Sequence, residues 1–261
     1  MIDKGPLMAV TPALEAIPVS LDAILSLREG YRREMGCQIV HDSWHARGFA
    51  THFSLIDRGC VVGYAAVGGA PGSASDIIKE FYVLPGHSAE ALPLFRCLIA
   101  ASKALFIEAQ TNDVLLSLML WDCAVELTSE TILFADAGPT QMAPADVKVG
   151  PLTAAARARV FHHTLEPVGD WGLTHGPEVV ATGGILFHYN PPYGDLYMEV
   201  VDSARGRGYG SYLVQELKRI CYEGGHVPAA RCQQSNVASR RTLERAGMLA
   251  CARIVRGRIA V

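Results

Sequence analysis

A glycine-rich segment late in the chain has the composition of a phosphate-binding loop. Arg205, Gly206, Arg207, Gly208 and Gly210 stand between a predicted strand and a predicted helix. The glycines allow a turn in which successive backbone N–H groups point outward, and the helix N-terminus behind them adds partial positive charge. The two arginines supply full charges suited to phosphate oxygens. The segment therefore predicts a cradle for a diphosphate.

The distribution of charge also favours a polyanionic ligand for this region. Residues 200–261 hold eleven Lys or Arg against four acids, a net charge of +7, which leaves −10 on the rest of a chain whose net charge is −3. A local cationic field within an acidic protein suits a polyanion, although solvated arginine-rich helix faces remain the alternative interpretation. No Lys/Arg run is interleaved with stacking aromatic residues, which disfavours nucleic acid.

A glycine-rich turn is on its own weak evidence, since it is also typical of a flexible loop or of a dinucleotide fingerprint. The nicotinamide-dinucleotide alternative is disfavoured because that fingerprint stands near the start of a βαβ unit, with an acid about 20 residues further on. Here the segment lies near the end of the sequence, and Glu223 falls at the end of a helix rather than of a strand.

Two motifs together resemble those of a known family. Arg205-x-x-Gly208-x-Gly210, following Val200, resembles the acyl-CoA-binding signature of the GNAT acetyltransferase superfamily. The segment from Asn236 to Met248 is similar to the family's Asn-led helix that ends in Gly and an apolar residue. The two motifs stand in the family's usual order and spacing and cover about residues 178–250, while the first half is similar only in its order of elements.

The resemblance implies an α/β (α+β) fold with a mixed, twisted sheet flanked by helices, whose fourth and fifth strands splay apart to admit acetyl-CoA as co-substrate. It implies a site for this molecule formed by Val200, Val201, Arg205, Gly206, Arg207, Gly208, Tyr209, Gly210, Ser211, Asn236 and Ser239. The implied activity is N-acetyltransfer to a primary amine, of a small molecule or a peptide N-terminus, by direct attack on the thioester. A non-catalytic protein that senses acyl-CoA is the alternative.

The groups that would move protons differ from the pattern of the family. Many family members carry a Tyr in the Asn-led helix as general acid, and the corresponding residue here is Leu243. Glu199, in the predicted fourth strand, is the candidate general base if burial raises its pKa. However, side chains alternate along a strand, and Glu199 has the opposite parity to the catalytic Glu of well-known relatives. A partnered structural carboxylate is the alternative role for Glu199.

Other chemically suggestive residues carry less weight. Cys232 lies in a predicted strand without an evident His partner, so we expect it to be a buried core thiol rather than a nucleophile. His41 and His45 have the i, i+4 spacing of helical metal ligands, but no third ligand is evident, so no metal is predicted. His162 and His163 are adjacent, and adjacent helical residues do not share a face.

The composition excludes several classes of protein. Half of the 261 residues are hydrophobic and 19% are charged, as in globular domains. No apolar run reaches the roughly 18 residues of a membrane span, and no secretory signal is evident at the start. Seven cysteines, an odd number without a Cys-x-x-Cys pair, suggest reduced thiols in a cytoplasmic protein.

Hydrophobic periodicity predicts alternating helices and strands in two halves. The first twenty residues are expected to be a lead-in, and residues 137–151 a linker. Helices are expected over 20–35, 89–104, 114–124, 152–161, 209–223 and 237–246, and strands over 53–56, 61–67, 79–84, 105–109, 132–135, 178–189, 195–201 and 228–233. We expect domains at 1–145 and 146–261.

The two halves carry similar strand ends, which suggests a tandem duplication. Ala109-Gln-Thr-Asn112 matches Gln233-Gln-Ser-Asn236 at an offset of 124 residues. The first half has Pro85-Gly86-His87 in place of the glycine-rich loop, and no arginine stands between that segment and Arg96. We therefore expect residues 1–145 to be a degenerate GNAT-like domain without the diphosphate loop, which completes the sheet, bounds the amine pocket or forms a homodimer. Residues 146–261 are expected to be the acetyl-CoA-binding domain.

Overall fold

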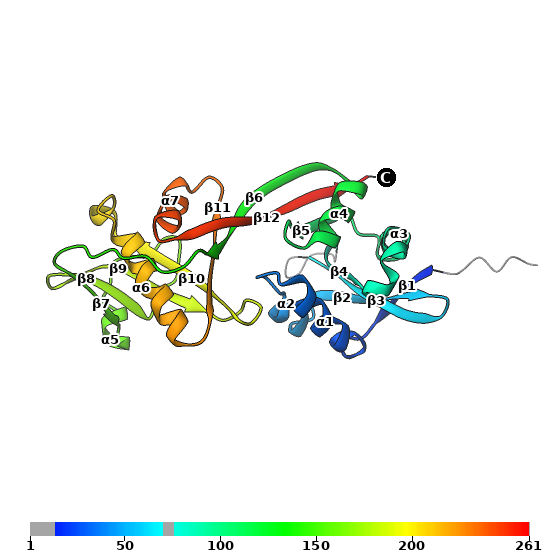
Figure 1. The fold of residues 1–261 in the computed structure, drawn as a ribbon, viewed down its shortest axis with the longest axis horizontal. Coiled ribbons are helices and arrows are strands. Elements are labelled where there is room, and N and C mark those ends of the chain that lie inside the picture. The colour runs from blue at the N-terminus through cyan, green and yellow to red at the C-terminus, as the bar shows by residue number, and fades with distance from the viewer. Residues whose placement is uncertain (1–13, 70–75, 261) are drawn as a thin grey trace, which may run out of the picture. The chain divides into compact units, whose positions relative to one another are not determined.

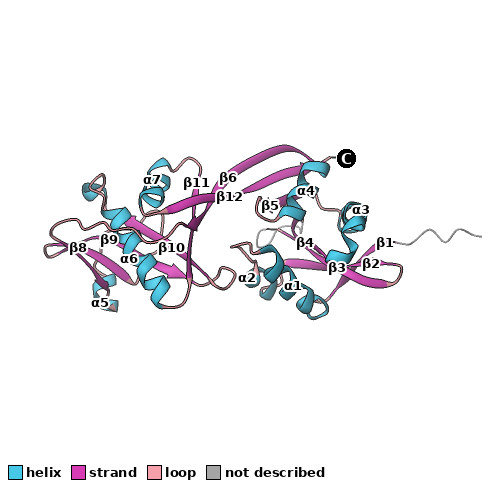
Figure 2. Cartoon of the chain, in the orientation of Figure 1, coloured by secondary structure: helices cyan, strands magenta, loops and turns pink. Residues whose placement is uncertain are grey.

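The computed structural model describes residues 14–69 and 76–260 (Figure 1). Within these residues twelve strands are hydrogen-bonded in the order β1-β2-β3-β4-β5-β12-β6-β11-β10-β9-β8-β7, with parallel and antiparallel neighbours (Figure 2). The α+β fold with a mixed sheet predicted from the sequence is therefore confirmed. The chain forms two compact units. Unit 1 comprises the described parts of 1–35, 41–128 and 256–261, and unit 2 comprises 36–40 and 129–255.

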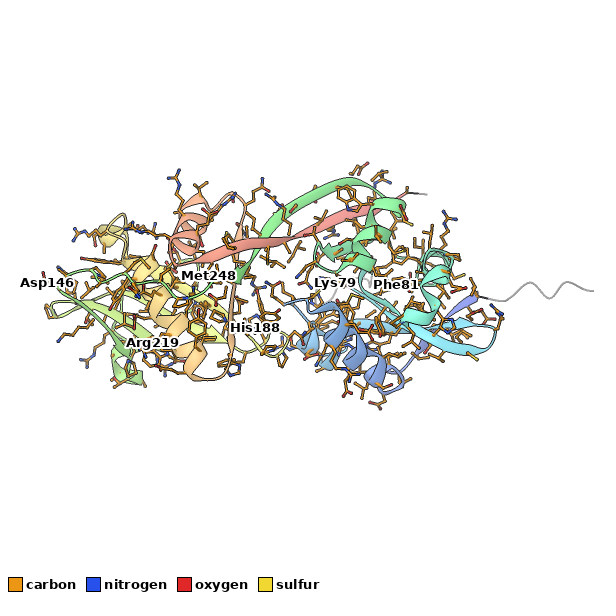
Figure 3. The ribbon with its side chains drawn as sticks, viewed as in Figure 1. Lys79, Phe81, Asp146, His188, Arg219 and Met248 are labelled. Atoms are coloured by element: carbon orange, nitrogen blue, oxygen red, sulfur yellow. The ribbon has the colours of Figure 1, made fainter. Side chains whose placement is uncertain are left out.

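Unit 1 is built on five strands, of which the first four are antiparallel neighbours and the fifth is parallel to the fourth. Phe81 and Phe95 in its core are fully buried and pack edge to face with ring centroids 4.8 Å apart; Figure 3 labels Phe81. The strands are β1 (Leu14–Val19), β2 (Ala50–Asp57), β3 (Cys60–Gly68), β4 (Ile77–Val83) and β5 (Phe106–Gln110). The helical segments are η1 (Leu21–Ile24), α1 (Leu25–Met35), α2 (Asp42–Ala46), η2 (Pro85–Glu90), α3 (Ala91–Ser102) and α4 (Val114–Cys123).

Unit 2 repeats this arrangement, with four antiparallel strands and a fifth strand parallel to the fourth. Leu213, Leu217 and Cys221, spaced i, i+4 and i+8 on α6, are buried in its core, as the helical period requires. The strands are β7 (Val147–Pro151), β8 (Trp171–His175), β9 (Glu178–Leu186), β10 (Tyr193–Val200) and β11 (Val227–Gln233). The helical segments are α5 (Ala154–Arg157), η3 (Asp202–Ala204), α6 (Tyr209–Glu223) and α7 (Val237–Arg245).

Two strands pass from one unit into the other. β6 (Ala124–Asp136) follows α4, and its later residues pair with β11 in unit 2, from Thr131↔Gln233 to Ala135↔Ala229. β12 (Met248–Ile259) follows α7 and ends in unit 1, where the N–H of Ile259 donates to the carbonyl of Leu105 at 2.8 Å. Because each unit takes a strand from the other half of the chain, the units do not coincide with a single cut at residue 145.

Most predicted helices and strands are present at nearly the expected positions. The predicted helix over 209–223 is α6, and the predicted helix over 20–35 begins as the 3₁₀ turn η1 and continues as α1. The helix expected over 152–161 is shortened to α5, which ends at Arg157. β8, β12 and α2 were not predicted.

Two expectations at the sheet edges were wrong. The lead-in contains β1, which pairs with β2, and the linker contains β7, which pairs with β8. Both are edge strands with mostly half-buried or exposed residues, so neither has the regular apolar alternation that marks a buried strand. The rest of the lead-in, residues 1–13, lies outside the described residues.

Candidate functional site

The site begins where two parallel strands of unit 2 separate. β10 pairs with β11 at Tyr193↔Val227, Gly194↔Pro228 and Asp195↔Ala229, and the pairing ends there. Both strands continue, β10 to Val200 and β11 to Gln233, so they form a fork that opens toward their carboxyl ends. This is the splayed strand pair that the sequence led us to expect.

The glycine-rich loop follows β10 at the open end of this fork and leads into α6. Gly206 and Gly208 have φ values of +78° and +82°, a left-handed conformation that strains any residue with a Cβ. Gly208 is also the N-cap of α6, and no side chain caps that helix terminus. The first N–H groups of α6 are therefore available to a ligand, and the helix dipole favours an anion there.

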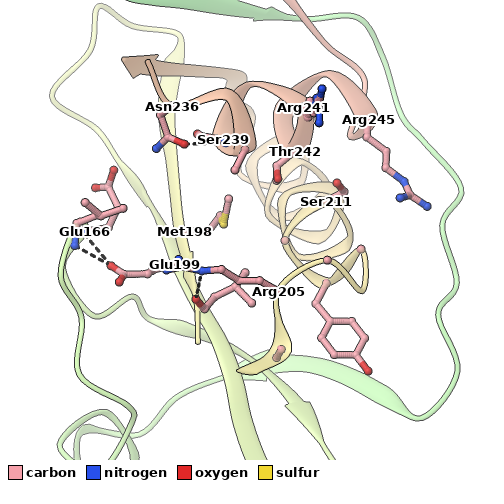
Figure 4. Close-up of a pocket in the computed structure, with 18 residues that line it drawn as sticks. Glu166, Met198, Glu199, Arg205, Ser211, Asn236, Ser239, Arg241, Thr242 and Arg245 are labelled. Carbon is pink, nitrogen blue, oxygen red and sulfur yellow. Dashed lines mark hydrogen bonds between the residues drawn. The ribbon is translucent and has the colours of Figure 1, made fainter. Parts of the chain in front are cut away.

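A cavity of about 320 Å³ extends from the last residues of β10, along the loop, to α7 (Figure 4). Its lining includes ten residues that were singled out in the sequence: Glu199, Val200, Arg205, Gly206, Gly208, Tyr209, Gly210, Ser211, Asn236 and Ser239. Val201 and Arg207 are not among the lining residues: the N–H of Val201 donates to the carbonyl of Val180, and Arg207 is exposed.

Two further arginines in the lining escaped the sequence prediction. Arg241 and Arg245 lie on α7 and face the cavity with Thr242. The guanidinium of Arg245 lies beside the loop, since a Cβ placed on Gly208 would be 3.8 Å from its Cζ, Nη1 and Nη2. Their i, i+4 spacing behind Asn236 is a signal that could have identified them, because it places both on one helix face.

Arg205 is partly committed to the protein itself. Its Nε donates to the carbonyl of Val200 at 3.2 Å, and its Nη2 lies 2.8 Å from Oδ1 of Asp202. These bonds fix the entry into the loop. The pair with Asp202 is exposed, so it is weak enough for Arg205 to exchange one partner for a ligand oxygen.

Asn236 acts as the N-cap of α7. Its Oδ1 accepts the N–H of Ser239 at 3.0 Å, which satisfies one of the donors left free at a helix start. In Figure 4 the amide nitrogen of Asn236 points away from the helix. The side chain thus positions α7 with one atom and leaves its amide N–H groups for a ligand.

Glu199 is buried beneath a second loop, residues 164–166, which forms the cavity wall opposite the arginines of α7. Its Oε1 accepts the N–H of Thr164 at 3.0 Å and the Thr164 hydroxyl at 3.1 Å. Its Oε2 accepts the N–H groups of Leu165 at 3.0 Å and Glu166 at 2.9 Å. Burial raises the pKa of this carboxyl, but these bonds outweigh burial and lower it to about 2. A carboxylate held in this way accepts protons poorly at neutral pH, which favours the structural alternative for Glu199 over the general base.

Leu243 and Cys232 carry no evident proton-transfer role. Leu243 is buried in the core of unit 2, so no hydroxyl stands where many relatives have their Tyr. Burial raises the pKa of the Cys232 thiol, as expected for a core cysteine.

The histidines considered as metal ligands have other partners. Nε2 of His45 lies 3.0 Å from Oε1 of the buried Glu80, and its Nδ1 lies 2.8 Å from Nε2 of His52. Arg28 binds the same carboxylate through Nε and Nη2, both at 3.0 Å. His163 bonds to Thr182 and to the carbonyl of Glu166. Across residues 14–69 and 76–260, no group of three or more His, Cys, Asp or Glu side chains is arranged for a metal ion.

Unit 1 also has a forked strand pair, but its loop is different. β4 pairs with β5 only at Ile77↔Phe106 and Ile78↔Ile107. After β4 the chain enters η2 at Pro85, where unit 2 has the glycine-rich loop.

None of the described helices combines the length and apolar character needed to cross a membrane.

Comparisons with known proteins agree with this geometry. The family model described as "Acetyltransferase (GNAT) family" matches residues 145–248. A comparison with curated protein sequences finds no match.

Solved structures with a similar fold cover nearly the whole chain. An acetyltransferase of the GNAT family from Colwellia psychrerythraea has a TM-score of 0.70 and 18% identity, covering 94% of this chain and 100% of its own. A GCN5-related N-acetyltransferase from Sphaerobacter thermophilus has a TM-score of 0.58 and 15% identity, covering 95% of this chain and 96% of its own. A tandem GNAT protein from the clavulanic acid biosynthesis pathway has a TM-score of 0.53 and 11% identity, covering 95% and 99%.

Proposed function

Because residues 145–248 match the family model of the GNAT acetyltransferases, we propose that unit 2 transfers an acetyl group from acetyl-CoA to a primary amine. The observation that carries this proposal is the cavity that joins an arginine-lined glycine loop to the end of β10, where β10 has separated from β11. One part of this cavity suits a diphosphate, and the fork offers an extended slot for the pantetheine chain.

The residues present fit acetyl-CoA. Free N–H groups at the start of α6, together with Arg205, Arg241 and Arg245, would hold the phosphate oxygens. A side chain on Gly210 would lie 3.2 Å from Thr242 and 3.4 Å from Val200, so glycine keeps the floor of the cavity open. When bound, acetyl-CoA supplies the thioester that an amine attacks. The chain's own residues orient the two reactants, which lowers the entropic part of the barrier.

We propose that unit 1 binds no acyl-CoA. Its 3₁₀ segment η2 carries Pro85 and lacks the glycine turn, and Arg96 is the first arginine after the strand. Unit 1 instead contributes strand residues to the shared sheet and holds the last residues of β12.

Binding and turnover test the proposal together. Calorimetry with CoA should show binding to the intact protein and strongly reduced binding to a double variant, Arg205→Ala with Arg245→Ala. Release of free thiol from acetyl-CoA should then appear with some members of a panel of primary amines. Failure of the intact protein to bind CoA would show that the assignment is wrong.

A second candidate function is an acyl-CoA sensor without turnover. Leu243 favours it, because no Tyr hydroxyl stands at that position to protonate the thiolate. CoA binding without thiol release for any amine would identify the sensor.

A further inference from the structure

One carboxylate that lines the cavity has no partner among the residues that the structure describes. Glu166 lines the cavity wall opposite the arginines, and Figure 4 shows Glu166 and Glu199 on one side of Met198, with Arg241 and Arg245 on the other. Within residues 14–69 and 76–260, no hydrogen bond or ion pair reaches the Glu166 carboxylate. Its backbone, by contrast, is held at both ends of the residue.

The loop that carries Glu166 is fixed from below. The N–H of Glu166 donates to Glu199 at 2.9 Å, and its carbonyl oxygen lies 3.1 Å from Nδ1 of His163. Nε2 of His163 in turn lies 3.1 Å from the hydroxyl of Thr182 on β9. The ring of His163 also stacks on Phe161, with centroids 4.6 Å apart. These contacts hold the main chain of Glu166 while leaving its side chain free over the cavity.

The neighbouring carboxylates already have hydrogen-bond donors or cations as partners. Glu199 accepts four hydrogen bonds from the loop. Asp195, the last β10 residue paired with β11, has its Oδ2 3.2 Å from Nε2 of His188 and 3.5 Å from Nη2 of Arg231. Glu166 is the one member of this acidic group that has no compensating donor in the described structure. The Glu166 side chain is exposed at the cavity wall, so a positively charged ligand can reach it without displacing a protein donor.

The charge pattern of the cavity therefore separates two kinds of ligand. Arginines and a helix N-terminus at one part attract phosphates, whereas an anion beside Glu166 would be repelled. The ligand that suits Glu166 is a cation small enough to reach the fork, and a primary ammonium has both properties.

We propose that Glu166 binds the ammonium group of the acceptor and accepts its proton, and that Glu199 is the positioning residue that holds Glu166 in place. This inference rests on the proposed transferase function. In the step, the Glu166 carboxylate takes one proton from R–NH3⁺ and leaves R–NH2. The nitrogen lone pair forms a bond to the acyl carbon as the carbon–sulfur bond breaks, and the sulfur keeps the bonding electrons. The nitrogen loses a second proton to the thiolate, which gives the amide and CoA thiol, and Glu166 returns its proton to solvent.

The electrostatic surroundings of Glu166 agree with this role. Loss of water contacts in the cavity wall, and then the Asp195 carboxylate, raise the pKa of Glu166, while Arg231 opposes them. A raised pKa makes a carboxylate a better proton acceptor near neutral pH. The titratable and charged groups around it are Asp195, Tyr197 and Glu199 from β10, Arg231 from β11 and His163 from its own loop.

The test compares Glu166→Gln with a matched control, Glu223→Gln, an exposed carboxylate at the far end of α6. Calorimetric affinity for CoA should stay unchanged in Glu166→Gln, because the phosphates bind elsewhere in the cavity. The kcat/KM for an amine that turns over should fall by about 100-fold or more at neutral pH, a typical loss for a general base. Part of this loss should be recovered at high pH, where the free amine is already neutral. The control should match the wild type in both measurements.

Three outcomes would overturn the proposal, and each is distinguishable. If the wild type binds CoA but releases no thiol with any amine, the transferase function fails, and the role of Glu166 fails with it. If the wild type is active and Glu166→Gln keeps its rate and its pH profile, only the role of Glu166 is wrong. If Glu166→Gln raises KM alone, with kcat and its pH profile unchanged, Glu166 binds the ammonium but is not the proton acceptor.

Discussion

The ammonium of Lys218 lies 2.7 Å from Oδ1 of Asp136, and the lysine side chain is almost completely buried. The same nitrogen donates to the carbonyl oxygens of Gly138 at 2.5 Å and Ala246 at 2.9 Å. One side chain of α6 therefore ties β6 to the end of α7, and α7 carries the arginines that line the cavity. A buried charge with this many partners is costly to break from one side, since the remaining carboxylate is left without its cation.

Replacing this lysine should destabilise unit 2. We expect Lys218→Met to lower the free energy of unfolding by about 3 kcal/mol, because it removes the cation paired with Asp136 and the donor to the carbonyl oxygens of Gly138, Ala246 and Gly247. Urea denaturation measures the change. The control is Arg219→Met on the exposed face of the same helix, where ion pairs to Glu216 and Glu223 are solvated and the expected loss is below about 1 kcal/mol. Equal losses in the two variants would contradict the structural role of Lys218.

The conformation of the glycine loop predicts a specific loss of ligand binding. Gly208 has φ +82°, and a Cβ there costs about 1–2 kcal/mol in a left-handed conformation. Gly208→Ala should therefore weaken CoA binding by about tenfold, through distortion of the turn rather than through a clash, since its new Cβ meets only ordinary contacts. Gly86→Ala in η2 is the matched control, because Gly86 has open space around it and no positive φ. Equal affinities of the two variants for CoA, measured by calorimetry, would contradict this prediction.

Arg245 and Arg207 differ in position although both stand near the loop, and this gives a third prediction. Arg245 lines the cavity beside Gly208, whereas Arg207 is exposed and is not part of the lining. Arg245→Ala should weaken CoA binding by about tenfold or more, as expected for a charge-assisted bond to phosphate. Arg207→Ala should have a smaller effect that disappears as salt is added, because an exposed charge is screened. The opposite ranking at 0.15 M salt would show that the loop contacts phosphate in another way.

The sequence was sufficient to predict the elements that carry strong local signals. α6 has a clear apolar stripe and a glycine loop before it, and the strands β10 before this loop and β11 after α6 have recognisable ends. The loop was found for that reason, whereas Asn236 and the fork were predicted from the resemblance to the GNAT family. β1, β7 and the exchange of β6 and β12 were not predicted, because edge strands lack a buried face and partner choice depends on contacts distant in the sequence.

The candidate site was predicted in part for a related reason. The residues of the diphosphate cradle can be recognised in the sequence by their glycine and arginine spacing, but Glu166 lies in an irregular loop without any motif. Only the fold shows that Glu199 accepts the N–H groups of residues 164–166 and that the Glu166 carboxylate has no such donor among the described residues. Which of two nearby acids is free is decided by hydrogen bonds that no spacing rule contains.

The hydrogen bonds of Glu199 make stability depend on pH in a definite direction. Its carboxyl pKa is lowered from 4.5 to about 2 in the folded protein. A carboxyl with a lowered folded pKa contributes stability that is fully present above its unfolded pKa and is lost as the pH falls toward the folded value. Glu199→Gln should cost about 2 kcal/mol at pH 7, as expected for lost bonds to a charged acceptor. The difference from wild type should shrink between pH 4.5 and pH 2 in unfolding measurements. An exposed carboxylate on the same sheet, in Glu178→Gln, should show no such change, and a gap that is constant with pH would contradict the account.

The exchange of strands between the units predicts that the family-matched half will not fold alone. A chain of residues 146–261 lacks the part of β6 that pairs with β11 from Thr131↔Gln233 to Ala135↔Ala229. It also lacks Leu133 and Phe134, both fully buried, and Asp136, the partner of Lys218. Loss of two buried side chains of this size costs about 2–5 kcal/mol each, which is comparable to the total stability of a domain. We therefore expect this fragment to show no cooperative unfolding transition and no CoA binding, whereas co-production with residues 1–145 should restore both. A fragment of 146–261 that unfolds cooperatively and binds CoA with full affinity would show that β6 is dispensable for unit 2.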